Sequence, residues 1–179
     1  MRVIVCAIFS EAKALIEFYD LKLTAKKPFN IFENDGMALI ISNMGKINAA
    51  VATAYIATIK KPDKIINIGI CASVGKNRQI GSLYKIRSVI EASSGKKAVI
   101  SNEGEVLYCF DKPVENKPKE NILIDMESYG FYAAASKFVK KEDIKIYKIV
   151  SDYLEVSHID SKFVYTLMKN NLSKFEEIV

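Results

Sequence analysis

The stretch IDMESYGFYAA, residues 124–134, places two carboxylates and a thioether where an apolar strand meets a helix. Ile124 ends a short apolar run, and the residues from Ser128 onward are typical of a helix. Asp125, Met126 and Glu127 therefore follow the carboxyl end of a predicted strand. In open α/β sheets, ligands bind beyond the carboxyl ends of the strands. We interpret this junction as part of a binding site.

The same alternation of strand and helix extends outward from this junction in both directions. Apolar runs predict strands at residues 2–9, 64–75, 122–125 and 145–152, with further strand-like stretches in 81–93 and 96–110. Between them we expect a helix at 10–21 with Ser10 as its N-cap, a buried helix from Gly45 to before Pro62, and helices at 126–141 and 161–179. Asn-Asp-Gly predicts a hairpin near residues 29–42, and residues 111–121 form the clearest exposed loop.

This order of elements predicts one domain spanning residues 1–179. The fold class is α/β, a three-layer sandwich in which helices flank a central mixed, largely parallel β-sheet. Half of the residues are hydrophobic (50%), which is enough to bury a core.

The composition argues against several classes of partner. The 26 Lys and Arg outnumber the 21 Asp and Glu, but only three are Arg and the lysines are spread along the chain, which indicates a solvated surface rather than a nucleic-acid interface. The apolar N-terminal run is too short to span a bilayer. Cys6, Cys71 and Cys109 are odd in number and widely spaced, as expected of reduced thiols in a cytoplasmic protein. His158 is the sole histidine, which disfavours a histidine metal site or a Ser-His-Asp triad.

Three carboxylates, those of Glu11, Glu127 and Asp152, each follow an apolar strand. One acidic residue at a helix start most often only stabilises the helix dipole. Three acidic residues in equivalent positions favour convergence of their side chains on one cleft. Whether they converge depends on the order of the strands. Small residues also follow the central strand, at Cys71 and Ala72, where they permit either close approach of a ligand to the backbone or merely a tight turn.

Taken in order, the motifs AIFSEAKAL, SNMGKINAA, KPDKIINIGICASVG, IDMES and IVSDYLEVSH resemble the nucleoside phosphorylase and uridine phosphorylase superfamily. Within it, they are most similar to the methylthioadenosine/S-adenosylhomocysteine nucleosidases. The resemblance covers residues 1–91 and the chain from about residue 122 onward.

The resemblance implies cleavage of the N-glycosidic bond of a purine nucleoside or 5′-thionucleoside, without a metal or organic cofactor. It implies that Met126 packs under the ribose and that Glu127 accepts hydrogen bonds from its hydroxyls. Asp152 matches the general acid that protonates the purine at N7, oriented by Ser151. Glu11 matches the residue that activates the attacking water. Cys71 and Ala72 are expected to line the substrate pocket.

Water is favoured over phosphate as the nucleophile. Phosphorylases surround phosphate with arginines and a serine. This chain instead has Asn67 and Ile70 in the central-strand motif, and no Arg lies near Glu11. Lys13 and Lys46 leave phosphorolysis as the alternative.

The resemblance is weakest in the middle of the chain, which is shorter than in typical members of the family. Tyr108 and Phe110 are candidates for stacking on the base, or equally for packing. A nucleoside-binding protein without catalysis is therefore a second alternative. The resemblance also implies a homo-oligomer, a dimer or an assembly of dimers, with the helix over residues 47–59 as an interface unless it is buried in the monomer.

Overall fold

The computed structural model describes residues 1–114, 118, 121–155 and 159–178. Its ten strands are β1 (Arg2–Cys6), β2 (Lys22–Ala25), β3 (Ile31–Glu33), β4 (Met37–Ile41), β5 (Lys64–Ser73), β6 (Leu83–Glu91), β7 (Lys97–Val99), β8 (Glu105–Cys109), β9 (Leu123–Asp125) and β10 (Ile144–Asp152). Its helices are α1 (Phe9–Phe18), α2 (Lys46–Lys60), α3 (Ser128–Ala135), the short η1 (Lys141–Asp143), α4 (Ser161–Lys169) and α5 (Leu172–Ile178).

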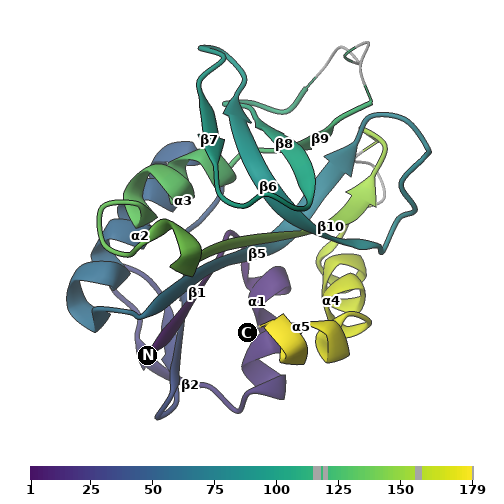
Figure 1. The fold of residues 1–179 in the computed structure, drawn as a ribbon. Helices are drawn as coiled ribbons and strands as arrows, with labels where there is room; N and C mark the ends of the chain where they lie inside the picture. Colours follow the sequence, from purple (N-terminus) through teal and green to yellow (C-terminus); the bar gives the residue numbers. More distant parts are fainter. Residues whose placement is uncertain (115–117, 119–120, 156–158, 179) are drawn as a thin grey trace.

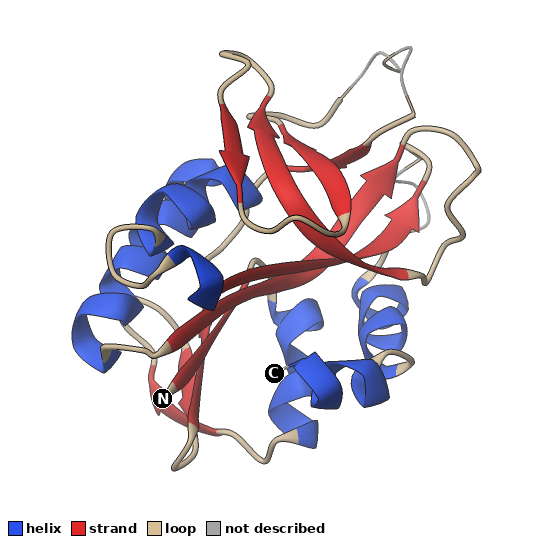
Figure 2. Cartoon of the chain, viewed as in Figure 1, coloured by secondary structure: helices blue, strands red, loops and turns tan. Residues whose placement is uncertain are grey.

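Helices cover both faces of the sheet, as the ribbon and the cartoon show (Figures 1 and 2). Helices α2 and α3 lie on one side, where Ile56 and Phe131 pack in a buried core with Ile65 of β5. Helices α1, α4 and α5 lie on the other side, where Leu15 and Met168 pack in a second core. The predicted three-layer α/β sandwich is confirmed.

Strand β5 is the centre of the sheet because it changes neighbours along its length. Over residues 64–67 it pairs in parallel with β1, whereas Ala72 and Ser73 pair antiparallel with β9 on the far side of the point where β1 ends. Strand β10 pairs in parallel with β5 and antiparallel with β6, and β6 continues through β8 to β9. Strands β5, β10, β6, β8 and β9 thus close into a ring, above the open sheet in Figure 1.

The predicted hairpin is confirmed in β3 and β4, where the Asn34 side chain accepts the backbone N–H groups of Gly36 and Met37. Ser10 is not the N-cap of α1, because the helix begins at Phe9 and Ile8 occupies the cap position. Helix α3 is shorter than expected, because the hydrogen bonds from Lys137 and Phe138 tighten to an i→i−3 pattern.

Two other helix predictions were wrong. The segment 161–179 is not one helix but two, α4 and α5. Buried Asn171 separates them, and its side chain donates to the backbone oxygens of Leu167 and Gly81. Helix α2 is not buried on all sides: Ala49, Ala52 and Ile56 face the core, whereas Ile47 is 79% exposed.

The start of α2 touches α3 closely. A Cβ added to Gly130 would lie 1.9 Å from the backbone oxygen of Lys46, so only glycine permits this contact. The two helix starts are therefore held against each other. Within the described part of the chain, none of the helices is long and apolar enough to cross a membrane.

Candidate functional site

A cavity of about 440 Å³ lies at the point where β1 and β9 diverge from β5. This is the kind of position at which α/β sheets bind ligands, and the volume suits a small organic molecule. The cavity brings together Glu11, Glu127 and Asp152, which come from three separate strand exits. Four further residues predicted to contact the substrate also line it: Cys71, Ala72, Met126 and Ser151.

The carboxylate of Glu11 is held by the backbone. Its Oε1 accepts the N–H of Ile70 at 2.8 Å, and its Oε2 accepts those of Ala7 at 2.8 Å and Ile8 at 3.2 Å. A carboxylate has about four acceptor positions, so roughly one is left for a ligand or water. Burial raises the pKa of Glu11, opposed by Lys148 and these hydrogen bonds. Gly69 makes the room, since a Cβ there would lie 2.6 Å from Glu11 Oε1.

Glu127 stands at the start of α3 with its side chain in the cavity. Its Oε1 accepts the Gly45 N–H at 2.8 Å, so the backbone at the start of α2 helps to hold the Glu127 carboxylate in place. Burial, with a further contribution from Asp125, raises the pKa of Glu127 to about 7. Met126 lies beside it and lines the same cavity.

Asp125 and Lys148 form a buried ion pair that was not predicted from the sequence. Lys148 Nζ lies 3.0 Å from Asp125 Oδ2, and the side chains are 2% and 1% exposed. The same Oδ2 accepts the N–H of Ser128 at 3.0 Å, at the start of α3, and a bond from its hydroxyl. The sequence did carry a signal, because Lys148 interrupts the apolar strand KIYKIV with a charge that must find a partner.

A β-bulge brings Ser151 and Asp152 into the cavity together. Successive residues of a regular strand point to opposite faces, but the register of β10 against β5 shifts between Val150 and Asp152. Ser151 Oγ lies 2.6 Å from Asp152 Oδ2 and 3.1 Å from the Cys71 carbonyl oxygen. Asp152 Oδ1 accepts the N–H of Leu154 at 2.7 Å, in a turn where Leu154 has a φ of +69°.

Lys112, Pro113 and Val114 form the wall of the cavity that follows β8. Neither Tyr108 nor Phe110 is among the described lining residues, so the expectation that one of them stacks on a base gains no support. Asp111 ties this wall to the start of α2 through an ion pair with Lys46 at 2.8 Å. His158 lies outside the described residues.

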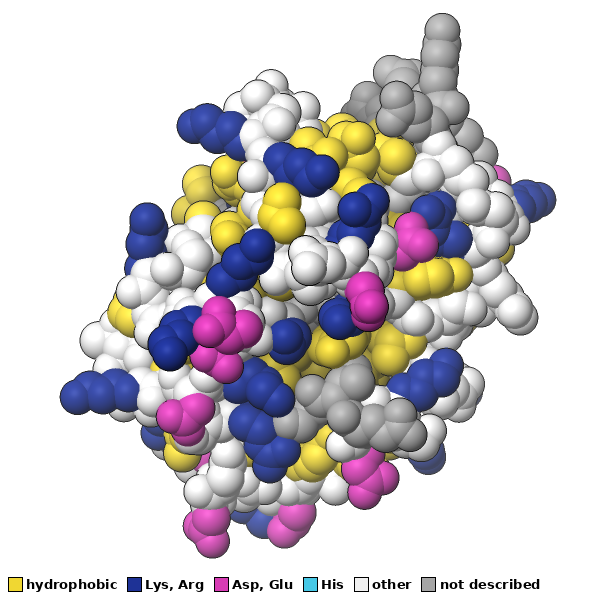
Figure 3. All heavy atoms as spheres, viewed as in Figure 1, with side chains coloured by type: hydrophobic (Ala, Val, Ile, Leu, Met, Phe, Trp, Pro, Cys, Tyr) yellow, Lys and Arg dark blue, Asp and Glu magenta, His cyan; other side chains and the backbone are white. Residues whose placement is uncertain are grey.

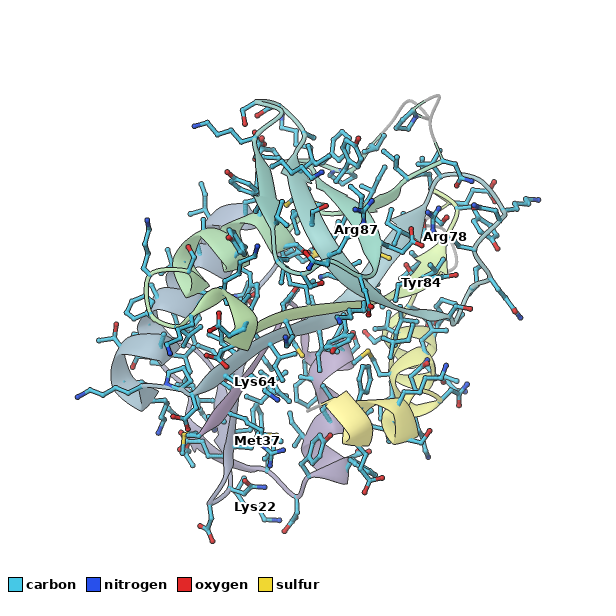
Figure 4. The ribbon with its side chains drawn as sticks, in the orientation of Figure 1. Lys22, Met37, Lys64, Arg78, Tyr84 and Arg87 are labelled. Atoms are coloured by element: carbon cyan, nitrogen blue, oxygen red, sulfur yellow. The ribbon has the colours of Figure 1, made fainter. Side chains whose placement is uncertain are left out.

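Four basic residues considered for an anion site do not line the described part of the cavity: Lys13, Lys46, Arg78 and Arg87. Lys46 also pairs with Glu91, and Lys13 lies 3.9 Å from Glu17 and over the ring of Tyr165. Arg78 binds Glu105 at 2.7 Å. Arg87 is exposed on β6, and Figure 4 shows Arg78 and Arg87 in the upper, ring-forming part of the molecule. On the face shown in Figure 3, basic side chains alternate with acidic and neutral ones.

Comparison with solved structures identifies the class of fold. The chain is similar to the 5′-methylthioadenosine/S-adenosylhomocysteine nucleosidase of Neisseria meningitidis in complex with methylthio-immucillin-A, with a TM-score of 0.80, 20% identity and coverage of 99% of this chain and 97% of that one. It is equally similar in shape to futalosine hydrolase of Helicobacter pylori, with a TM-score of 0.82, 13% identity and coverage of 99% and 97%. The chain therefore has the nucleoside phosphorylase-like fold, as predicted.

Comparison of sequences narrows the resemblance. A curated 5′-methylthioadenosine/S-adenosylhomocysteine nucleosidase of Haemophilus influenzae is 26% identical over 133 residues, which are 69% of this chain and 56% of that protein. The chain thus matches about half the length of this relative. No protein-family profile matches the sequence. The resemblance to these nucleosidases, inferred from the motifs, is confirmed.

Proposed function

We propose that this protein hydrolyses the N-glycosidic bond of a purine nucleoside or 5′-thionucleoside. The observation that carries the proposal is the convergence of Glu11, Glu127 and Asp152 on one cavity of about 440 Å³. Cleavage of this bond gives the sugar oxocarbenium character and the departing base a negative charge. The reaction therefore needs anionic groups beside the sugar and a proton donor beside the base.

Glu127 and Met126 would bind the sugar. Glu127 is 8% exposed and keeps acceptor positions beyond those that receive the backbone N–H groups of Gly45 and Met126. Ribose hydroxyls would donate to these positions. The thioether of Met126 offers a polarizable apolar surface for the face of the ring.

Asp152 would donate the proton to N7 of the base, and its contacts with Ser151 suit both of its charge states. The Ser151 hydroxyl has one hydrogen and two possible acceptors, the Cys71 carbonyl oxygen and Asp152 Oδ2. While Asp152 is protonated, Ser151 can donate to the Cys71 carbonyl, which leaves the single hydrogen of the acid available to N7 of the base. After proton transfer, the hydroxyl can turn and donate to the new carboxylate.

Glu11 would take a proton from the attacking water as oxygen bonds to the anomeric carbon. The proton lost by water and the proton gained by the base balance, giving a free sugar and a neutral base. Because burial raises the pKa of Glu11, its carboxylate is a stronger base than an exposed one. Its three backbone hydrogen bonds would hold the carboxylate in one orientation toward that water.

The distribution of cations favours hydrolysis over phosphorolysis. A phosphate site rewards several convergent donors, particularly arginine forks. Lys112 is the one lysine or arginine among the described residues that line the cavity. Lys46 is engaged with Glu91 and Asp111.

Nucleoside binding without cleavage is a second candidate. It is favoured by the match to only 56% of the curated relative and by a wall built from Pro113 and Val114, where no described aromatic side chain faces the cavity. A binding protein would retain the carboxylates as acceptors for hydroxyl groups.

A panel of nucleosides, incubated with and without phosphate and analysed by chromatography, separates these candidates. Hydrolysis releases free base without phosphate, and phosphorolysis releases it only with phosphate. A binding protein gives a calorimetric binding signal and no base. Glu11→Gln should lower hydrolysis by about 10²-fold or more while retaining binding of a nucleoside analogue. Glu17→Gln, an exposed change on the same helix, is the control.

A second copy of the chain would cover the mouth of the cavity. Met44 lines the cavity yet is 63% exposed, and Phe9, Ile47 and Val51 are 53%, 79% and 54% exposed nearby in the sequence of α1 and α2. Burial of such residues is the usual driving force of dimerisation. Sedimentation should give a dimer that Ile47→Asp dissociates. A monomeric wild type would overturn this part of the proposal.

A further inference from the structure

Lys148 is a fully buried cation placed among the carboxylates of the site. It lies in the middle of β10, 2% exposed, and pairs in register with Gly69 of β5, the glycine that makes room for Glu11. A lysine rarely lies so deep unless compensating charges surround it, because burial penalises the charged form. Burial alone would lower its pKa, but Asp125, Glu127 and Glu11 together raise it.

The charges around Lys148 are unequal in number. Three carboxylates act on it, those of Glu11 on α1, Asp125 on β9 and Glu127 at the start of α3. We call these three residues the carboxylate cluster. One ammonium cannot neutralise all three. Lys148 also acts on the buried thiols of Cys6, Cys71 and Cys109.

The three carboxylates of the cluster make different contacts. Asp125 makes the direct ion pair through Oδ2, and its Oδ1 is buried with no hydrogen-bond partner among the described residues. Glu11 and Glu127 accept backbone N–H groups instead and face the cavity. Lys148 is not among the described lining residues, so it acts on the two cavity carboxylates through space, while Asp125 anchors it.

We propose that Lys148 is a positioning residue whose buried ammonium sets the charge of the carboxylate cluster, and that Asp125 balances it. The inference rests on the proposed nucleoside hydrolysis only for its consequence in turnover. With the ammonium present, Glu127 can give up its proton near neutral pH and accept bonds from sugar hydroxyls. Without it, the buried carboxyls of Glu11 and Glu127 would retain protons more strongly, and the cavity would lose negative charge beside the developing sugar cation.

The two partners should shift the titration of Glu127 in opposite directions. The charge of Lys148 lowers the pKa of Glu127, and the charge of Asp125 raises it. Lys148→Met should therefore raise the titration midpoint by about 1–3 pH units, the usual effect of losing a close opposite charge. Asp125→Asn should lower it, and the double variant should return it toward the wild-type value near 7.

The experiment measures the Glu127 carboxyl by ¹³C NMR across pH in the absence of substrate, and the acid limb of kcat/KM for base release. Lys148→Arg should restore the wild-type midpoint, because it restores the charge. Lys145→Met, on the same strand and only partly buried, is the matched control and should leave the midpoint unchanged.

The outcomes separate this inference from the proposed function. An unchanged Glu127 midpoint in Lys148→Met, or shifts of the same sign in Lys148→Met and Asp125→Asn, would overturn the role of Lys148 whatever the protein cleaves. Absence of base release by the wild type would overturn the hydrolysis and leave the NMR test intact. If Lys148→Met does not fold, the Asp125→Asn variant and the charge-balanced double variant still decide the question.

Discussion

The two sides of the cavity are built differently. On one side, which we call the carboxylate wall, Glu11, Glu127 and Asp152 are 3%, 8% and 6% exposed and are held by backbone N–H groups. On the other, the loop wall of Lys112, Pro113 and Val114 lies at the surface and is tied to α2 by an ion pair at exposed Asp111. The groups proposed for chemistry are thus held by buried backbone contacts, and those that would contact the variable part of a substrate are held by a contact at the surface. Substitutions on the two walls should therefore differ in size and kind.

Asp152→Asn should have the largest effect, because it removes the proposed proton donor. Base release should fall by about 10²–10⁴-fold, the usual contribution of general acid catalysis, while binding of a nucleoside analogue persists. Steady-state kinetics and calorimetry measure the two quantities. Asp160→Asn, which alters only the N-cap of α4, is the control. Undiminished turnover by Asp152→Asn would remove this residue from the acid role.

The carboxylate wall should also weaken the fold at neutral pH. Glu127 has a pKa of about 7 in the folded state against 4.5 as its ordinary value, so the folded state binds more protons between these pH values. Its contribution to stability is present at low pH and is lost as pH rises through 7, by about 3 kcal/mol in total. Glu127→Gln should remove this loss, so that its gain in unfolding free energy is larger at pH 8 than at pH 5.

Urea unfolding of wild type and Glu127→Gln at both pH values measures this difference. Glu103→Gln, at an exposed position, provides the comparison. A variant that tracks the wild type at pH 5 and pH 8 would contradict the raised pKa.

Gly69→Ala tests how strictly the carboxylate wall is positioned. The new Cβ would lie 2.6 Å from Glu11 Oε1 and must displace the carboxylate. Misplacing a catalytic group by about 1 Å can cost about 10²-fold in rate. Turnover should fall by about that factor, with circular dichroism unchanged. Gly36→Ala is the control, since its Cβ would approach no nearer than 4.0 Å to another residue. Equal activity of the two variants would argue against the placement of Glu11.

Asp111→Asn should have the smallest effect, because it alters only the link between the loop wall and Lys46. An ion pair of this partly exposed kind contributes about 0.2–1 kcal/mol. KM should rise by at most about fivefold with kcat unchanged, and added salt should diminish the difference. Asp35→Asn, in the β3–β4 turn, is the control. A fall in kcat instead would place Asp111 in the chemistry.

The sequence predicted the carboxylate wall better than the loop wall. Glu11, Glu127 and Asp152 follow strands with strong apolar patterns, and the strand-end rule then places them at one edge of the sheet. The loop wall lies outside the motifs that carry the resemblance, in a segment where periodicity is absent. There, the proposed stacking residues Tyr108 and Phe110 were assigned by aromatic type alone, without a pattern to locate them.

Long-range features of the site could not be read from the sequence. The bulge at Ser151 depends on the register between β10 and β5, and closure of the ring depends on antiparallel pairing of the three-residue β9. The pair of Lys148 and Asp125 joins residues from two strands. The positive charge of Lys148 within the apolar pattern of β10 indicates that a partner of opposite charge exists, but it does not identify that partner. The break at Asn171 likewise depends on Gly81, which is remote in sequence.

The contact between Gly130 and the Lys46 carbonyl has a consequence for the engineering of this site. The peptide that carries the N–H of Gly45 also begins α2, whose first side chain reaches the loop wall, while Gly130 lies one turn into the helix that Glu127 begins. The two walls are thus joined through one close backbone contact, between Gly130 and Lys46. A methyl group at position 130 would not fit there. A longer, substrate-selective loop could be grafted after β8 without disturbing the acids only if positions 45, 46 and 130 retain their present geometry.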